Sequence, residues 1–529
     1  MAASSDRSRF LETLPSHPDL EFQRKRAKEL LRAAWRGDGE AVARVAALHP
    51  HPPKPEDLKL ADAQLVLARG YGFESWAALT RKIASLTGTP VDAFLSALNE
   101  GDVERVRALL RDHADVRAAI NAPISHFNSR PVARATKNLP MLDLLLEYGA
   151  DLNQKSEWWA GGFGLLEYGC TPSDAAALMA RGAAPDVFAA AHLGMFDRVR
   201  ALVDAQPSLV LAKGGDGKTP LHCATTVEIA AYLLDRGAEI DARDVDHEST
   251  PLQYLVKDAP EVARLLVDRG AWFDIFIASW LRDRALIARC LREDPEALDH
   301  RTGRGRYRVA HNGKAPSTPE QRAGLRGDIY RWVFEHNVSA LDVVIARGDT
   351  ETRDLLLGAA TPVQQLLAAS AAADRATALA VVAADPGAVS RMTASQRAVI
   401  SDRAMANDTR AVLLMLELGF DPLATPDPGG WEAVRWAAYH GNVEMMRPLL
   451  ARQPPINVPD PAYNGTMLGN CLHGAIHGWR RRSGDYPETV RLLLAAGERL
   501  DPEWVPIGRD DVDAVLRDAL MKQRGRLES

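Results

Sequence analysis

The chain has 529 residues, of which 46% are hydrophobic and 25% are charged, and its formal net charge at pH 7 is −6. It can therefore bury an extensive core, and its slight acidity gives no global electrostatic case for binding nucleic acid or membranes. The four cysteines are scattered and include no CxxC pair, which fits neither a disulfide framework nor a zinc site. We expect free, buried thiols in a reducing compartment.

Neither the N-terminus nor the apolar stretches of the chain favour export or membrane insertion. Residues 1–20 are polar and carry acids, unlike a secretion signal. The most apolar long segment, residues 366–384, is interrupted by Asp374 and Arg375. We therefore expect a cytoplasmic protein with no membrane partner. The excess of arginine over lysine is associated with bacterial sources.

Residues 1–88 precede the regular part of the sequence. Within them, residues 58–83 have a helical pattern that contains GYGFESW at 70–76. A terminal unit of a repeat array must shield the open end of the stack. We therefore predict a helical N-terminal cap.

Residues 89–299 carry glycines at a fixed interval. Gly149 and Gly182 are 33 residues apart, as are Gly237 and Gly270, and each ends an apolar helical stripe. A glycine just past a helix adopts the left-handed capping conformation without strain. The recurrence predicts helix pairs repeated in register.

A second motif accompanies these glycines. Residues 217–224 read GKTPLHCA, and STPL recurs at 249–252. With the 33-residue period, the motif resembles the ankyrin repeat, a turn and two antiparallel helices that stack into an α-solenoid. The resemblance implies an all-α fold, a concave surface that binds a protein partner, and a structural part for His222, which hydrogen-bonds local backbone and the Thr219 hydroxyl in such repeats. The N-terminal cap is similar to a leader found before ankyrin repeats in some bacterial proteins.

The pattern weakens toward the C-terminus. Junctions in which a glycine and then Asp or Asn join two helices occur at 97–104, 344–351 and 437–444, but WEAV replaces the TPLH element at 431–434. We therefore predict degenerate ankyrin-like repeats and a C-terminal cap over 331–529.

Residues 300–330 do not fit the period and are rich in glycine and arginine. Arg306 and Arg308 flank Tyr307, an alternation that could contact phosphate and stack on a base or sugar. Because the patch is short and the whole chain is acidic, a solvated or anion-binding loop is favoured over a nucleic-acid contact.

Two further places break the repeat pattern in its first half. Trp158 and Trp159 are adjacent, so in an extended segment they would point in opposite directions and could not easily enter one core. His126 lies where a TPLH element would be expected, and local rule-breaking concentrates at functional sites. We consider all three as contact or pocket-lining candidates, with core and cap packing as the alternative for the tryptophans.

The sequence contains only weak candidates for metal ligands. A turn between repeats carries Asp246, His247 and Glu248. We favour a partner contact or a solvated turn for these residues, because a metal site needs ligands from several loops. His473 and His477 would share one helix face, but Gly474 stands where a zinc motif has glutamate. We expect no metal and no cofactor, and regard His477 and Trp479 as ligand-facing candidates beside a packing role.

The sequence contains no recognisable Ser-His-Asp or Cys-His constellation. We expect a scaffold that presents its repeats to a protein partner. The alternative is an enzyme or small-molecule-binding protein whose pocket combines residues 125–126, 158–159 and 246–247 with the arginine-rich insertion, because turns one repeat apart are neighbours in a solenoid.

Overall fold

The computed structural model describes residues 8–15, 18–167, 170–425, 430–460 and 465–527. These residues form helices and connecting turns and include no β-strand, which confirms the all-α prediction. They belong to two compact units, one built from Met1–Thr89 and Ala369–Ser529 and the other from Pro90–Ala368. No helix among the described residues combines the length and the apolar character needed to cross a membrane.

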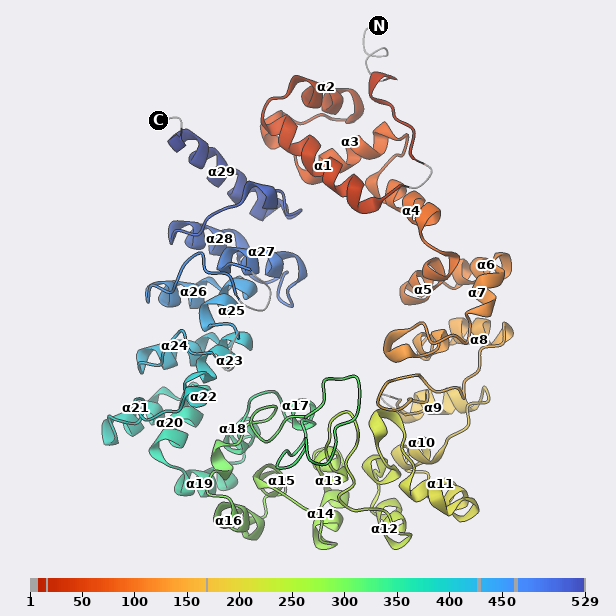
Figure 1. Ribbon diagram of the computed structural model, residues 1–529, viewed down its shortest axis with the longest axis vertical. Helices are drawn as coiled ribbons and strands as arrows, with labels where there is room; N and C mark the ends of the chain where they lie inside the picture. Colours follow the sequence, from red (N-terminus) through yellow and green to blue (C-terminus); the bar gives the residue numbers. More distant parts are fainter. Residues whose placement is uncertain (1–7, 16–17, 168–169, 426–429, 461–464, 528–529) are drawn as a thin grey trace. The chain divides into compact units, whose positions relative to one another are not determined.

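The unit Pro90–Ala368 is a succession of short helix pairs (Figure 1). Its α-helices are α5 Pro90–Glu100, α6 Val103–Asp112, α7 Ala114–Ala118, α8 Leu139–Glu147, α9 Pro172–Met179, α10 Val187–His192, α11 Phe196–Ala205, α12 Val227–Asp235, α13 Pro251–Leu255, α14 Pro260–Asp268, α15 Ile275–Trp280, α16 Arg284–Glu293, α17 Tyr330–Val333, α18 Ala340–Ala346 and α19 Thr350–Ala359. Its 3₁₀ turns are η3 His126–Asn128, η4 Pro131–Arg134, η5 Pro207–Leu211, η6 Gly215–Gly217, η7 Pro220–Cys223 and η8 Ala297–Asp299. Helix α20, Pro362–Ala371, crosses the boundary between the units.

The second unit also consists of paired helices. Its N-terminal segment contains η1 Ser8–Phe10, α1 Leu20–Trp35, α2 Gly39–Leu48, η2 Pro55–Asp57, α3 Leu60–Gly70 and α4 Trp76–Thr87. Its C-terminal segment contains α21 Arg375–Ala384, α22 Ala394–Arg397, α23 Val399–Met405, α24 Thr409–Glu417, α25 Ala433–His440, α26 Val443–Leu450, α27 Met467–His477, α28 Tyr486–Ala495, η9 Pro502–Trp504 and α29 Asp510–Leu527. The two segments touch: Arg32 Nε donates to the Val505 carbonyl at 2.7 Å, and Lys59 pairs with Asp510 at 3.0 Å.

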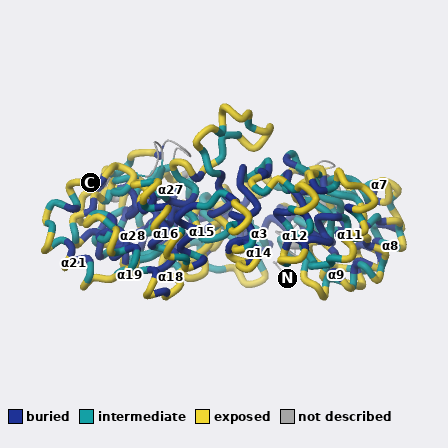
Figure 2. Tube along the Cα trace, turned by 90° about the horizontal axis from the view of Figure 1, so that it is seen from below, coloured by how far each residue is buried: buried dark blue, intermediate teal, exposed yellow. Residues whose placement is uncertain are grey.

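The junctions within helix pairs have the predicted chemistry. Gly101 and Gly348 have φ of +73° and +71°, which only glycine adopts without strain. The next residues, Asp102 and Asp349, accept hydrogen bonds from backbone amides of the first turn of the second helix. Figure 2 shows the result, with buried residues between the paired helices and exposed residues on the turns.

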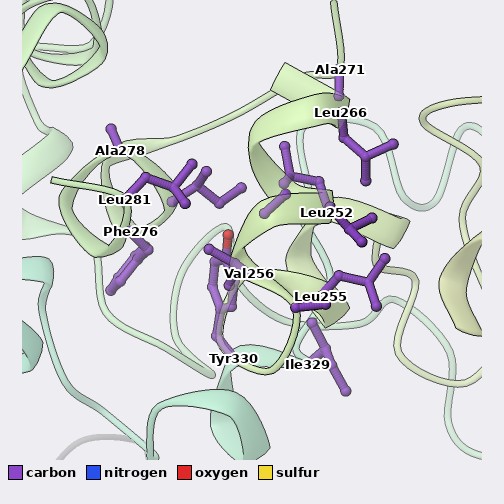
Figure 3. Packing of buried hydrophobic residues seen from close by; sticks show 14 of the residues in the cluster. Leu252, Leu255, Val256, Leu266, Ala271, Phe276, Ala278, Leu281, Ile329 and Tyr330 are labelled. Atoms are coloured by element: carbon purple, nitrogen blue, oxygen red, sulfur yellow. The ribbon is translucent and has the colours of Figure 1, made fainter. Parts of the chain in front are cut away.

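The core of the unit Pro90–Ala368 incorporates the end of the arginine-rich insertion. Figure 3 shows Ile329 and Tyr330 beside Leu255 and Val256, at the end of α13. Phe276 of α15 belongs to the same cluster of buried side chains. Tyr330 donates its hydroxyl proton to Asp274 at 3.1 Å. The insertion is therefore anchored by apolar packing and by a buried hydrogen bond.

His222 has the structural part that the family resemblance implies. Its Nδ1 accepts a hydrogen bond from the Thr219 amide at 3.0 Å and lies 2.9 Å from the Thr219 hydroxyl. Its Nε2 donates to the Ser249 carbonyl of the next repeat at 3.1 Å. The ring thus joins two successive repeats.

Lowering the pH is expected to weaken this link between the two repeats. Burial lowers the pKa of His222 from 6.5 to about 3. Between these values only the unfolded chain takes up the proton, so the stabilising effect of His222 is complete above pH 6.5 and falls as the pH is lowered. In urea unfolding, the stability advantage of the wild type over His222→Gln should shrink by about 1.4 kcal/mol per pH unit below 6.5. An advantage that stays constant down to pH 5 would contradict this expectation.

Candidate functional site

The candidate residues lie in two separate places, one in each compact unit. His477 and Trp479 belong to the unit that contains α25 and α27. The others lie in the unit Pro90–Ala368: His126, Trp158, Trp159, Asp246, His247, Glu248, Arg306, Tyr307 and Arg308.

The first place is a groove beside α25 and α27, which we call the aromatic groove. It has a volume of about 1040 Å³. Its lining comes from these two helices, from the segments next to them and from the segment after α28, with one lysine from α1: Lys28, Gly430, Trp431, Trp436, Tyr439, Gly465, Gly469, Asn470, Leu472, His473, Ile476, His477, Trp479, Trp504 and Ile507. Aromatic side chains therefore dominate one wall of the groove.

The aromatic wall centres on Trp479. Its ring is stacked on that of Trp436, with centroids 6.3 Å apart and an angle of 22° between the planes. Tyr439 meets Trp479 edge-on at 5.8 Å, and Trp431 lies 4.7 Å from Trp436. Despite these contacts, 72% of Trp479 is exposed. A large aromatic surface is thus exposed to solvent beside other aromatic rings.

Close helix packing places this wall. A Cβ atom on Gly474 of α27 would lie 2.0 Å from the Tyr439 carbonyl oxygen of α25, so only glycine permits this approach. The Tyr486 hydroxyl of α28 donates to the same carbonyl at 3.0 Å. Helix α27 ends at His477, Gly478 is extended, and a turn follows at residues 479–483. Trp479 is therefore presented from a turn whose position is fixed by the packed helices.

Positive charge lies next to the wall. Arg480, Arg481 and Arg482 follow Trp479 and are exposed, and none of them forms an ion pair with a described residue. Burial lowers the pKa of His440 at the end of α25, and Arg480 adds to this effect. The apolar aromatic lining of the groove is thus followed along the chain by three exposed guanidinium groups without an ion-pair partner among the described residues.

The second place is the turn that connects the repeat containing α12 to the repeat containing α13. The insertion covers this turn. An aromatic row leads to it: the rings of His126 and Phe127 are 4.0 Å apart, and Phe127 lies 4.8 Å from Trp158. Trp158 meets Trp159 at 6.2 Å, and Trp159 meets His311 of the insertion at 4.9 Å. The adjacent tryptophans join one row, in contrast to the predicted opposite directions, because the chain turns at residues 159–160 and is not extended there.

The insertion is hydrogen-bonded to the turn. His311 Nε2 donates to the Asp246 carbonyl at 2.7 Å, and the Ala310 amide donates to Glu248 at 2.9 Å. Glu248 and Tyr307 are buried, and the Tyr307 hydroxyl donates to Asp274 at 3.0 Å. These two candidates therefore hold the insertion in place and do not present a surface to a partner.

The remaining insertion candidates lie outside the core. Arg306 is exposed and pairs with Asp294 at 3.0 Å, and Arg308 is exposed. Within residues 306–308, the two arginines therefore face solvent and the tyrosine lies in the core.

His247 lies at the centre of a group of carboxylates. Its Nδ1 is 3.0 Å from Asp328, and its Nε2 is 3.8 Å from Asp246 and 4.0 Å from Asp216. Burial raises the pKa of Asp216, while Lys218 and His247 oppose that rise. The solvated turn that the sequence favours is instead an ion-paired, mostly buried cluster, because the insertion covers it.

Comparison with known proteins identifies the repeats. Residues 187–276 match the family model for ankyrin repeats in three copies, and residues 400–450 match the one for ankyrin repeats in many copies. The mouse (Mus musculus) ankyrin repeat and SAM domain-containing protein 6 is 32% identical over 91 residues, which are 16% of this chain and 10% of that protein. The chain contains ankyrin repeats.

The ankyrin matches include parts of both places. Residues 187–276 contain Asp216, Asp246 and His247, and residues 400–450 contain α25 with its groove aromatics. The chain spans about a tenth of the length of the curated relative that it matches, so the likeness is limited to the repeats. Both places are therefore built on ankyrin repeats and completed by segments that these matches do not cover: α27 with the turn after it, and the insertion.

Several residues of these sites were not predicted. Asp216, His311 and Asp328 join the cluster around His247, and Trp436 and Tyr439 form the wall behind Trp479. The spacing of three between Trp436 and Tyr439, which places both on one face of a helix, is the available signal. No comparable pattern marks the acids, because they lie far apart in the sequence.

Proposed function

We propose that this ankyrin-repeat protein binds another protein by holding a short segment of it in the aromatic groove. The observation that carries the proposal is Trp479, stacked on Trp436 yet 72% exposed. Tryptophan and arginine are the residues most enriched among those that dominate binding energy in interfaces. The ankyrin repeats themselves indicate a protein-interaction scaffold, because stacked repeats provide extended binding surfaces.

The chemistry of the groove indicates which side chains the bound segment carries. The aromatic wall favours an apolar or aromatic anchor side chain, because burial of that side chain removes Trp479 from water. The unpaired Arg480, Arg481 and Arg482 favour carboxylates beside the anchor, since guanidinium groups bind carboxylates through paired hydrogen bonds. We therefore propose a segment with an apolar anchor flanked by acidic residues.

Selection from a random peptide library displayed on phage tests this proposal. Peptides captured by the full chain should be enriched in an aromatic or large aliphatic residue flanked by Asp and Glu. Trp479→Ala should weaken their binding at least tenfold, as expected for the loss of an interface tryptophan worth about 2 kcal/mol. A higher salt concentration should also weaken peptide binding, because the arginines are exposed.

Trp332→Ala is the matched control. Trp332 is also an exposed tryptophan, 59% accessible, but it lies in the unit Pro90–Ala368. Its replacement should leave the affinity unchanged. Peptides without acidic residues, or equal losses in both variants, would contradict the proposal.

We also propose that the protein works in the reducing cytoplasm. All four cysteines are free thiols. Burial raises the pKa of Cys223 to about 11 and that of Cys290 to about 12, so these thiols stay protonated and unreactive at neutral pH.

A further inference from the structure

We propose that Asp216, Asp246 and His247 form a binding site for a divalent transition-metal cation of the Zn²⁺ or Co²⁺ class. One potential ligand atom from each of the three residues lies within 4.8 Å of the others. The ligands come from two successive repeat turns, and the site is in the unit Pro90–Ala368, whereas the residues of the aromatic groove belong to the other unit. It is thus independent of the proposed peptide binding.

The imidazole of His247 has the orientation of a metal ligand. Its Nδ1 lies 3.0 Å from the buried Asp328 carboxylate, to which the Nδ1 proton is donated. In the neutral ring this leaves the Nε2 lone pair directed to the side of Asp216 and Asp246. A carboxylate that holds the far nitrogen of the ligand histidine is the usual outer shell of protein zinc sites.

The spacing needs only a small adjustment to bind the ion. His247 Nε2 is 3.8 Å from Asp246 Oδ2 and 4.0 Å from Asp216 Oδ2. Ligands at about 2.0–2.1 Å from a tetrahedral zinc ion lie roughly 3.3 Å apart. The two carboxylate oxygens lie within 4.8 Å of each other, so movements of up to about 1 Å in the two carboxylates would complete three bonds, with water as the fourth ligand.

The two turns are already fixed to one another. The Asp216 carbonyl accepts the amides of Val245 at 2.7 Å and Asp246 at 3.1 Å. At Gly217, where φ is +73°, a Cβ atom would lie 2.3 Å from a methyl carbon of Val245. The backbone that carries the ligands is thus preorganised, and little ordering is required when the ion binds.

The local charge also favours a cation. Four carboxylates surround the imidazole: Asp216, Asp244, Asp246 and Asp328. The basic groups next to them are Lys218, 4.0 Å from Asp216, and Arg331, 3.4 Å from Asp328. The charge of Lys213 also acts on Asp244, so with a neutral imidazole the four carboxylates exceed the basic groups by one. Largely buried charges of this kind are stable when paired or bound to a metal.

Cobalt titration of the full-length, EDTA-treated protein tests the site. We expect one equivalent of Co²⁺ to produce the visible absorption of a cobalt ion in a protein site, and Zn²⁺ to displace it. Asp246→Asn should weaken binding at least tenfold. Asp246 is suitable because its side chain is partly exposed and, within the described part of the chain, forms an ion pair with His247 alone. Asp328→Asn should weaken binding by roughly 10–100-fold through the orientation of His247.

His473→Gln with His477→Gln is the matched control. These histidines lie on one face of α27, with ring centroids 4.8 Å apart, and are the competing histidine pair for the same ions. Their replacement should leave the cobalt signal unchanged, and thermal melting in EDTA should show that every variant is folded. The proposal is overturned if the wild type gives no stoichiometric signal, if Asp246→Asn keeps it, or if the control loses it. His247 would then be an imidazolium that serves only as an ion-pair partner of the carboxylates.

Discussion

Gly474→Ala is expected to destabilise the unit that contains α25 and α27 by about 3 kcal/mol. In an ordinary helix this change is favourable by roughly 0.5–1 kcal/mol, because glycine loses more backbone entropy than alanine. Here the added Cβ would lie 2.0 Å from the Tyr439 carbonyl oxygen and 2.8 Å from its carbon, so the two helices must separate. Urea unfolding followed by tryptophan fluorescence measures the change.

Gly469→Ala and Gly358→Ala are the controls for this prediction. Gly469 lies in the same helix, where the nearest atom to an added Cβ is 3.8 Å away. Gly358 lies in α19 with nothing within 4 Å. Both changes should be neutral or slightly stabilising. If Gly474→Ala behaves like them, the packing of α25 on α27 described above is incorrect.

Asp274→Ala is expected to destabilise the unit Pro90–Ala368 by about 3–5 kcal/mol. Asp274 caps α15 through the Ile277 amide at 3.0 Å and accepts the hydroxyl protons of Tyr307 and Tyr330. Its removal loses the cap and the carboxylate that accepts the protons of two buried hydroxyls. Burial raises the pKa of Asp274, and hydrogen bonds from the Ile277 and Phe276 amides and from the two tyrosine hydroxyls oppose that rise.

A cap without tyrosine partners provides the comparison. Asp283 caps α16 through the amides of Ala285 and Leu286, so Asp283→Ala should cost only about 1 kcal/mol. In a double-mutant cycle, Tyr330→Phe should reduce the further effect of Asp274→Ala. Equal losses for the two aspartates, or no coupling with Tyr330, would contradict the anchoring of the insertion by Asp274.

The repeat features could be predicted because each is local. Glycine at the end of a helix, aspartate at the start of the next and histidine three residues after Thr219 act within one turn of chain. Their meaning depends on short sequence spacing, which is visible without a structure. The helix pairs, the absence of strands among the described residues and the part of His222 followed from them.

The sites were less predictable because their partners are distant in sequence. Tyr307 stands between two arginines and looks like a surface residue, but Asp274 from an earlier repeat gives its hydroxyl a buried partner. His247 seemed to lie on a solvated turn, but Asp328 at the far end of the insertion folds back onto it. Trp479 was identified as a candidate without Trp436 behind it, since no repeat period relates these residues.

Site-directed photocrosslinking tests the central claim, peptide binding in the aromatic groove, most directly. A benzoylphenylalanine at His477, which lines the groove, would be irradiated in the presence of a selected acidic peptide with an apolar anchor. The same group at exposed Trp332 is the control. We predict peptide adducts at position 477, suppressed by Trp479→Ala, and none at position 332. Adducts at 332 alone, or equal adducts at both positions, would contradict binding in the groove.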